Sequence, residues 1–313
     1  MRRREFVSLL GMGAVAQEPA AIRVDVNLVN VPFSVRDARG QLVKTLGRED
    51  IEVLEDGVPQ PVKHFSQGKD SALALGLLVD GSGSQEEFLK KHRRDLRDFL
   101  KNVMLAQDRA FLLGFGNHLR LVAGMTNSAD ELMDRLQQYQ KGKDLDRFGI
   151  VGPRERRVLG TAFYDAIYHA ADDVLAAAEG TRRALIVFSD GEDNSSAHHM
   201  LEAIEAAQRA GVAMFGVRYT ELNKGRWNAR NKYGRAVMER IARETGGLDV
   251  DATEAEDLRE PFRQIADILR ATYDLGYSST SSGKGGVFRK IEIRGKRAGL
   301  VFRHKTGYFG RSD

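Results

Sequence analysis

From Ala72 onward the sequence alternates between short apolar runs and amphipathic stretches, and this alternation most constrains the fold. The first run, residues 73–79, is almost unbroken and is followed at residues 85–103 by apolar side chains at helical spacing. A strand that is apolar on both sides is buried on both faces, and parallel strands need a crossover, which a helix supplies. The alternation recurs at residues 110–115 and 129–139, 184–188 and 199–210, 212–217 and 236–244, and 248–250 and 254–271. The pattern predicts an α/β domain with a doubly wound, mostly parallel sheet.

Two flanking segments follow a period-2 pattern instead. In residues 22–69 apolar side chains such as Val24, Val26 and Leu28 alternate with polar ones, and residues 272–313 return to the same pattern. This pattern is typical of strands with one buried face. The C-terminal strands are too few to fold alone. We therefore expect them to pair with the N-terminal strands, so that the α/β domain, at residues 70–271, is inserted into a small antiparallel β-sandwich.

The first 16 residues resemble an export signal. Three arginines, Arg2 to Arg4, precede an uncharged stretch that ends in Ala14-Val15-Ala16, and Arg3-Arg4-Glu5-Phe6 also resembles the twin-arginine signal. The alternative is an amphipathic start to the fold. A signal predicts a periplasmic, cell-envelope or secreted bacterial protein. No later apolar run approaches the roughly 20 residues that span a bilayer, so we expect no transmembrane segment after signal removal.

Composition excludes several classes of function. The chain has no cysteine, which rules out disulfides, cysteine catalysis and thiolate metal sites. Its 48 basic residues nearly balance its 44 acidic residues and are scattered along the chain. No nucleic-acid partner is therefore predicted.

Polar side chains follow the first buried strand directly, in the segment Asp80-Gly81-Ser82-Gly83-Ser84. One carboxylate and two hydroxyls at alternate positions can converge on one point, and such oxygen ligands suit a hard cation, Mg²⁺, Ca²⁺ or Mn²⁺. By itself, however, a Gly- and Ser-rich segment is better explained as a turn.

Two further oxygen groups change that interpretation. Asp190 ends another apolar strand, and Thr161 lies at the start of a predicted helix over residues 161–178. Alone, Thr161 would be a helix N-cap and Asp190 a turn residue. All five groups nevertheless lie at strand-to-helix junctions of one sheet, where ligands of such folds bind. Together they predict a divalent-metal site.

This order of motifs resembles the von Willebrand factor A (VWFA) domain with its metal-ion-dependent adhesion site (MIDAS). The resemblance covers about residues 70–271. The flanking segments resemble an acidobacterial group of VWFA-related proteins, through Val53-Leu54-Glu55-Asp56-Gly57 and Leu275-Gly276-Tyr277. One departure is the segment Gly114-Phe115-Gly116-Asn117, which lacks an acidic residue that is often found there.

The resemblance implies a role for each site residue. Ser82 and Ser84 would bind the metal directly, whereas Asp80, Thr161 and Asp190 would bind it directly or through water. An Asp or Glu of a protein or peptide partner would fill the remaining position. The implied function is a metal-dependent interaction module and not an enzyme.

The alternative is a metal-dependent hydrolase of phosphoesters or esters that uses the same cation. No Gly-x-Ser-x-Gly elbow surrounds Ser82 or Ser84, and nothing in the sequence places a histidine beside either serine. Nucleotide binding is disfavoured because the chain lacks a phosphate-binding glycine loop.

Overall fold

The structure is a computed structural model that describes residues 28–67, 71–116, 118–142, 148–152, 160–178, 181–221, 226–280 and 286–310. The predicted export signal at residues 1–16, together with Val24 and Val26, lies outside these ranges. Within them, no helix combines the length and the apolar character that crossing a membrane requires.

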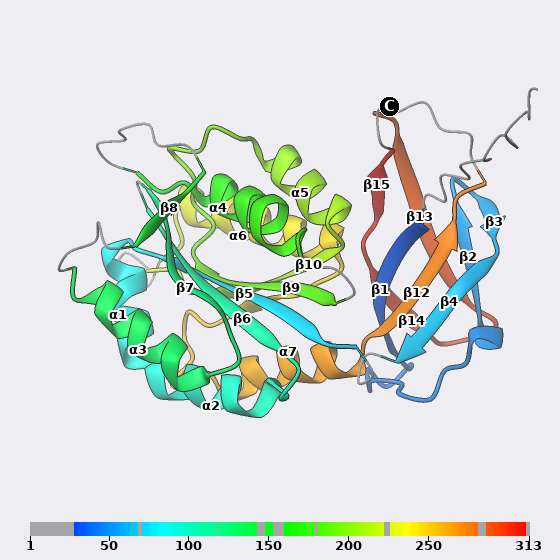
Figure 1. Ribbon diagram of the computed structural model, residues 1–313, viewed down its shortest axis with the longest axis horizontal. Helices are drawn as coiled ribbons and strands as arrows, with labels where there is room; N and C mark the ends of the chain where they lie inside the picture. The colour runs from blue at the N-terminus through cyan, green and yellow to red at the C-terminus, as the bar shows by residue number, and fades with distance from the viewer. Residues whose placement is uncertain are drawn as a thin grey trace, which may run out of the picture.

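A seven-stranded sheet forms the centre of the α/β domain (Figure 1), in the order β11-β10-β9-β5-β6-β7-β8. The strands are β5 (Leu73–Asp80), β6 (Arg109–Phe115), β7 (Leu119–Thr126), β8 (Gly149–Val151), β9 (Arg182–Ser189), β10 (Val212–Arg218) and β11 (Asp249–Asp251). All run in the same direction except β7, which pairs antiparallel with both β6 and β8. The sequence did not predict β7 and β8. The link between β6 and β7 is too short for a crossover and therefore forces a hairpin.

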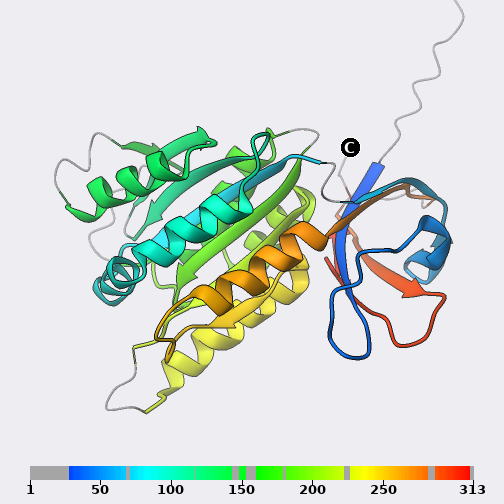
Figure 2. The ribbon, with the colours of Figure 1, turned by 90° about the horizontal axis from the view of Figure 1, so that it is seen from below.

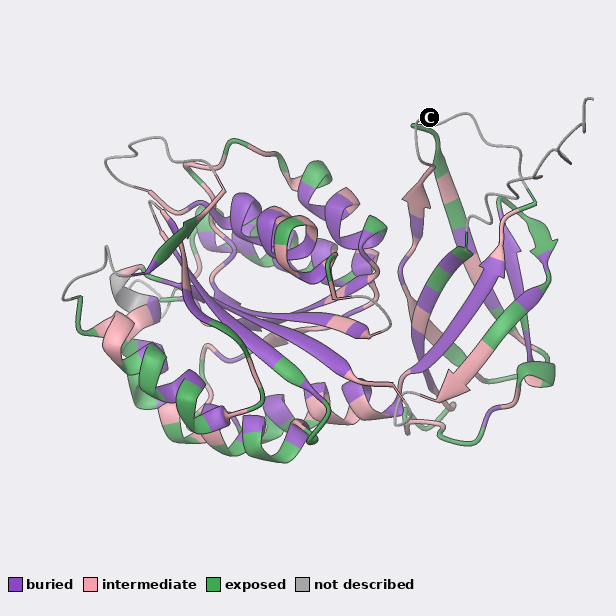
Figure 3. Ribbon diagram, in the orientation of Figure 1, coloured by how far each residue is buried: buried purple, intermediate pink, exposed green. Residues whose placement is uncertain are grey.

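Helices cover both faces of this sheet, and their buried sides face it (Figure 3). One face carries α1 (Gly83–Lys91), α2 (Arg93–Val103), α3 (Ala129–Gln140) and α7 (Arg259–Ala271). The other carries α4 (Phe163–His169), the π-helical turn η4 (Ala170–Leu175), α5 (Met200–Arg209) and α6 (Ala229–Thr245). The single helix expected over residues 85–103 is two helices that meet at the buried His92.

The flanking segments form two four-stranded antiparallel sheets, ordered β14-β1-β12-β4 and β15-β13-β2-β3. Their strands are β1 (Leu28–Arg36), β2 (Ile51–Glu55), β3 (Val58–Gln60), β4 (Val62–Gln67), β12 (Tyr273–Ser278), β13 (Phe288–Gly295), β14 (Val301–His304) and β15 (Gly307–Phe309), with a 3-10 turn, η1 (Arg48–Asp50). N- and C-terminal strands pair directly, as in β1 with β12 and β2 with β13, around one shared apolar core. The predicted fold class is confirmed.

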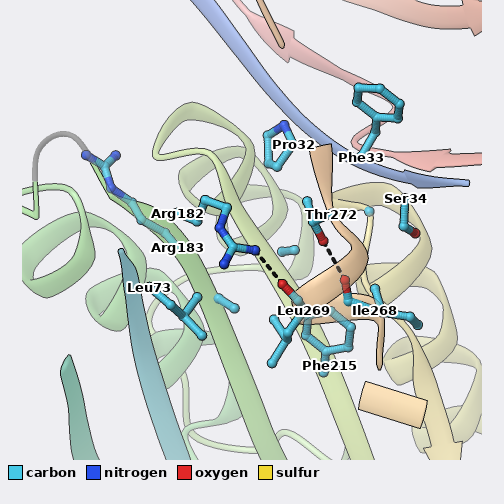
Figure 4. A pocket seen from close by; sticks show the side chains of 13 residues that line it. Pro32, Phe33, Ser34, Leu73, Arg182, Arg183, Phe215, Ile268, Leu269 and Thr272 are labelled. Carbon is cyan, nitrogen blue, oxygen red and sulfur yellow. Dashed lines mark hydrogen bonds between the residues drawn. The ribbon is translucent and has the colours of Figure 1, made fainter. Parts of the chain in front are cut away.

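A charged network of the α/β domain lies close to the point where α7 runs into β12, a strand of the β-sandwich. Asp108 is fully buried and accepts hydrogen bonds from the amides of Leu73 and Leu105, both at 2.8 Å, and its carboxylate pairs with Arg270 on α7 at 2.5 Å. Arg182, at the start of β9, donates to the carbonyl of Leu269 (Figure 4). These bonds hold the end of α7 against the starts of β5 and β9. A cavity of about 20 Å³ beside Arg182 has room for one water.

We predict that Asp108→Ala destabilises the protein by about 3 kcal/mol or more, because it leaves the buried Leu73 amide, the Leu105 amide and the Arg270 guanidinium without their acceptor. Urea unfolding measures the change. Asp98→Ala is the matched control, since Asp98 is exposed on α2 and should change stability by less than about 0.5 kcal/mol. Equal losses in both variants would contradict this account of the network.

Candidate metal centre

The candidate site lies at the edge of the central sheet where the parallel strands end. This edge faces away from the β-sandwich, because the sandwich joins the domain at the start of β5 and the end of α7 (Figures 1 and 2). Strands β5 and β9 are neighbours, and Val79 lies opposite Phe188. The register therefore puts Asp80 beside Ser189, with Asp190 one residue further on.

Asp80 is buried, and its carboxylate is held by two donors. Its Oδ1 accepts a hydrogen bond from the Ser82 amide at 2.9 Å, and its Oδ2 accepts one from the Ser189 hydroxyl at 2.8 Å. Burial raises the pKa of Asp80 to about 6, the hydrogen bonds from Ser82 and Ser189 oppose this rise, and the negative charge of Asp190 adds to it. The Asp80 carboxylate is thus held in a fixed orientation, and the described residues compensate its negative charge only in part.

Ser82 lies directly before α1, in extended conformation at the N-cap position. Serine at this position usually caps its helix through the hydroxyl, but Ser82 makes no such bond. Its hydroxyl instead helps to lower the pKa of the neighbouring Asp80 carboxyl, so the two groups lie close together. Ser84 lies in the first turn of α1, and its side chain is outside the described part of the structure.

Thr161 is brought to this edge by the end of β6. The carbonyl of Phe115 accepts from the Gly81 amide at 2.6 Å, and the next carbonyl, that of Gly116, accepts from the Ala162 amide at 2.9 Å. These two hydrogen bonds, to consecutive carbonyls after β6, therefore position the residues that directly follow Asp80 and Thr161. Asn194 makes two hydrogen bonds to the backbone of Thr161. Its side-chain oxygen accepts from the Thr161 amide at 2.7 Å, and its own amide donates to the Thr161 carbonyl at 3.1 Å.

The N-cap interpretation of Thr161 is wrong, because α4 begins at Phe163 and is capped from another loop. The carboxylate of Asp193 accepts from the amides of Phe163 and Tyr164 at 2.9 and 3.3 Å. No hydrogen bond joins the Thr161 hydroxyl to another described residue. That hydroxyl is free of the capping role that would otherwise compete with a cation.

Asp190 begins the loop that follows β9. Its Oδ1 accepts from the Glu192 amide at 3.0 Å. Burial raises the pKa of Asp190, and the hydrogen bond from Glu192 and the positive charge of Arg230 oppose this rise. The loop turns at Gly191, where φ is +82°.

These residues fit a hard divalent cation. The raised pKa values of Asp80 and Asp190, at adjacent strand ends, show that their negative charge is poorly compensated. The hydroxyls of Ser82 and Thr161 are not used as helix caps. Among the described residues, no group of three or more His, Asp or Glu side chains could hold a metal. A cation at this edge would therefore depend on serine and threonine oxygens, as Mg²⁺ and Ca²⁺ can.

Sequence reasoning did not assign the positioning roles of three residues. Ser189 orients the Asp80 carboxylate, Asp193 caps α4, and Asn194 holds the backbone of Thr161. Ser189 could have been found from the register of two adjacent parallel strands. Asp193 and Asn194 act on segments about 30 residues away, for which the sequence gives no local signal.

We predict that Asp80→Asn flattens the pH dependence of stability in the metal-free protein. Because the folded pKa of Asp80 is raised to about 6, the folded state keeps a proton that the unfolded chain has released. Stability of the parent should therefore fall as pH rises from 4 to 6, by at most about 3 kcal/mol from this residue. Urea unfolding in EDTA at pH 4.5 and 7 measures it, and an unchanged pH slope in the variant contradicts the assignment.

We also predict that Gly234→Ala displaces the Asp190 loop and weakens divalent-metal binding. A Cβ at Gly234, on α6, would lie 2.3 Å from the carbonyl oxygen of Asp190, so one of them must move. At a helix position without such a contact, replacing Gly by Ala would stabilise the helix by roughly 1 kcal/mol. Lys232→Ala, an exposed change on the same helix, is the control. Calorimetric titration with a divalent metal measures the affinity of both variants. An unaltered affinity in Gly234→Ala would contradict the claim that this contact positions the Asp190 loop.

Comparison with known proteins gives a family for part of the chain. The model of the von Willebrand factor type A domain matches residues 153–266, which include Thr161 and Asp190 but not β5 with Asp80. No match was found among the curated proteins.

Several solved structures are similar. An aerotolerance-related membrane protein from Bacteroides fragilis is 16% identical, with 63% of this chain and 98% of that chain covered and a TM-score of 0.44. BatB, a conserved hypothetical protein from Bacteroides thetaiotaomicron, is 17% identical, with 64% and 97% covered and a TM-score of 0.42. Proximal thread matrix protein 1 from the mussel byssus, with a zinc-occupied MIDAS motif, is 14% identical, with 67% and 48% covered and a TM-score of 0.47.

The family match and the observed topology agree. The matched residues run from the approach to Thr161 into α7. They include β9, which lies beside β5 in the parallel sheet, and β10, which lies beside β9. The α/β domain of this chain has the von Willebrand factor type A fold.

Proposed function

We propose that this chain is an exported, metal-dependent binding module that captures an acidic residue of a protein partner through a divalent cation, with Mg²⁺ as the expected metal. The observation that carries the proposal is the pair of carboxylates, Asp80 and Asp190, at the ends of adjacent strands. Asp80 is buried, and the negative charge of Asp190 adds to the rise in the pKa of its carboxyl. A divalent cation would relieve the charge that burial and Asp190 impose on it.

Five residues would hold the cation: Asp80, Ser82, Ser84, Thr161 and Asp190. When bound, the cation supplies an electrophilic position for a partner's Asp or Glu carboxylate. The chain's own residues hold this arrangement in place. Ser189 and the Ser82 amide orient the Asp80 carboxylate, and Asn194 fixes the backbone of Thr161.

Interaction rather than catalysis is the expected activity, because von Willebrand factor type A domains are typically adhesion or interaction modules. Export follows from the signal-like sequence at residues 1–16, which supports a periplasmic, cell-envelope or secreted location. We further propose that residues 22–69 and 272–313 form the sandwich unit and that residues 70–271 form the binding unit. Membership of the acidobacterial VWFA-related group stays a prediction.

Calorimetric titration with Mg²⁺ tests the proposal. We expect saturable binding at one site and at least about a 10-fold weaker affinity in Asp190→Ala, since a direct or water-mediated ligand is removed. Asp267→Ala is the control, because Asp267 lies in an exposed ion pair on α7.

Partner capture from a cell-envelope extract supplies the second half of the test. Capture should require Mg²⁺ and should be lost both in EDTA and in Asp190→Ala, but not in Asp267→Ala. The proposal fails if the parent binds no divalent metal, or if Asp190→Ala binds it like the parent.

A further inference from the structure

Helix α6 is fixed against the Asp190 loop by direct backbone contact. A Cβ at Gly191 would lie 2.3 Å from the carbonyl oxygen of Gly234, and a Cβ at Gly234 would lie 2.3 Å from that of Asp190. Only glycine allows two backbones to approach so closely. The position of α6 relative to Asp190 is therefore set by the fold and not by flexible side chains.

Arg230 lies one helical turn before Gly234 and so shares its face of α6, which faces the loop. Its Nε lies 2.5 Å from a carboxylate oxygen of Glu192. The Arg230 side chain is nevertheless 65% exposed, whereas that of Glu192 is only 17% exposed. A guanidinium has five N–H donors in a planar fork, so this ion pair leaves donors that face solvent.

Glu192 connects this arginine to the candidate metal centre. Its amide donates to Asp190 Oδ1 at 3.0 Å, and its side chain holds the Arg230 guanidinium. The cation of Arg230 is thus tethered to a proposed metal ligand through a single intervening residue. An anion bound at the metal would have an exposed positive group next to it.

We propose that Arg230 forms a second anion subsite beside the metal, so that the preferred partner segment carries two acidic groups, one for the cation and one for Arg230. This inference rests on the proposed function. The second group gains charge-assisted hydrogen bonds from a planar donor that suits a carboxylate. Since Arg230 is largely exposed, the gain is modest, about 5-fold in affinity.

The experiment uses the Mg²⁺-loaded protein and short peptides of the form acetyl-Asp-(Gly)n-Asp-amide, with n from 0 to 3. Each is compared by calorimetry with a matched peptide whose second Asp is Asn. We expect at least one spacing to show about a 5-fold preference for the second Asp. Arg230→Gln should remove that preference while leaving binding of the Asn peptide.

Two further variants separate an anion subsite from a structural effect. Arg235→Gln, which removes an exposed arginine of the same helix that pairs with Glu239, should keep the preference. Glu192→Gln should also keep it, because the side-chain amide oxygen of glutamine can still accept a hydrogen bond from the Arg230 guanidinium. The ratio between the paired peptides is the readout, since a general distortion of the site would weaken both peptides alike.

The inference is overturned if the parent shows no preference at any spacing, or if Arg230→Gln retains it. If single-acid peptides still bind in a Mg²⁺-dependent way, the proposed function survives that result. Absence of Mg²⁺ binding, in contrast, overturns both.

Discussion

The parallel pairing of β5 with β9 is the interaction on which the candidate site depends. Both strands are apolar on both faces and occupy the middle of the sheet, so their register is fixed by the two cores that they separate. That register puts Asp80 beside Ser189, and it brings the loop of Asp190 to the same edge. Asp80 is buried and Asp190 is partly buried, because both residues lie directly at the end of the apolar layer.

The burial of Asp80 and the partial burial of Asp190 oppose folding unless something compensates their negative charge. The Ser82 amide and the Ser189 hydroxyl stabilise the Asp80 carboxylate in part, and the raised pKa values of Asp80 and Asp190 show that the compensation is incomplete. Such locally unfavourable arrangements tend to occur at functional sites. A ligand that binds only the folded state and relieves the cost would stabilise the protein. The same arrangement would account both for the proposed metal binding and for a less stable metal-free state.

Sequence patterns predicted the parts of the structure that depend on local periodicity. The apolar run at residues 73–79 and its successors gave the parallel sheet, and the period-2 segments gave the sandwich built from both ends of the chain. Features that depend on distant contacts were missed or wrong. Strands β7 and β8 follow from a short connection after β6, and the start of α4 is decided by Asp193, which caps it from the β9–α5 loop. Thr161 was predicted as a metal ligand from its position, whereas its backbone is held by Asn194, 33 residues further along the chain.

The most direct measurement is the location of a bound ion in a crystal soaked in Mn²⁺, whose anomalous scattering identifies it. The account predicts one strong peak at the carboxyl end of β5, with oxygens of Ser82 and Ser84 bound to the ion and Asp80, Thr161 and Asp190 bound directly or through water. No peak at this edge, or a peak held by other residues, would contradict it.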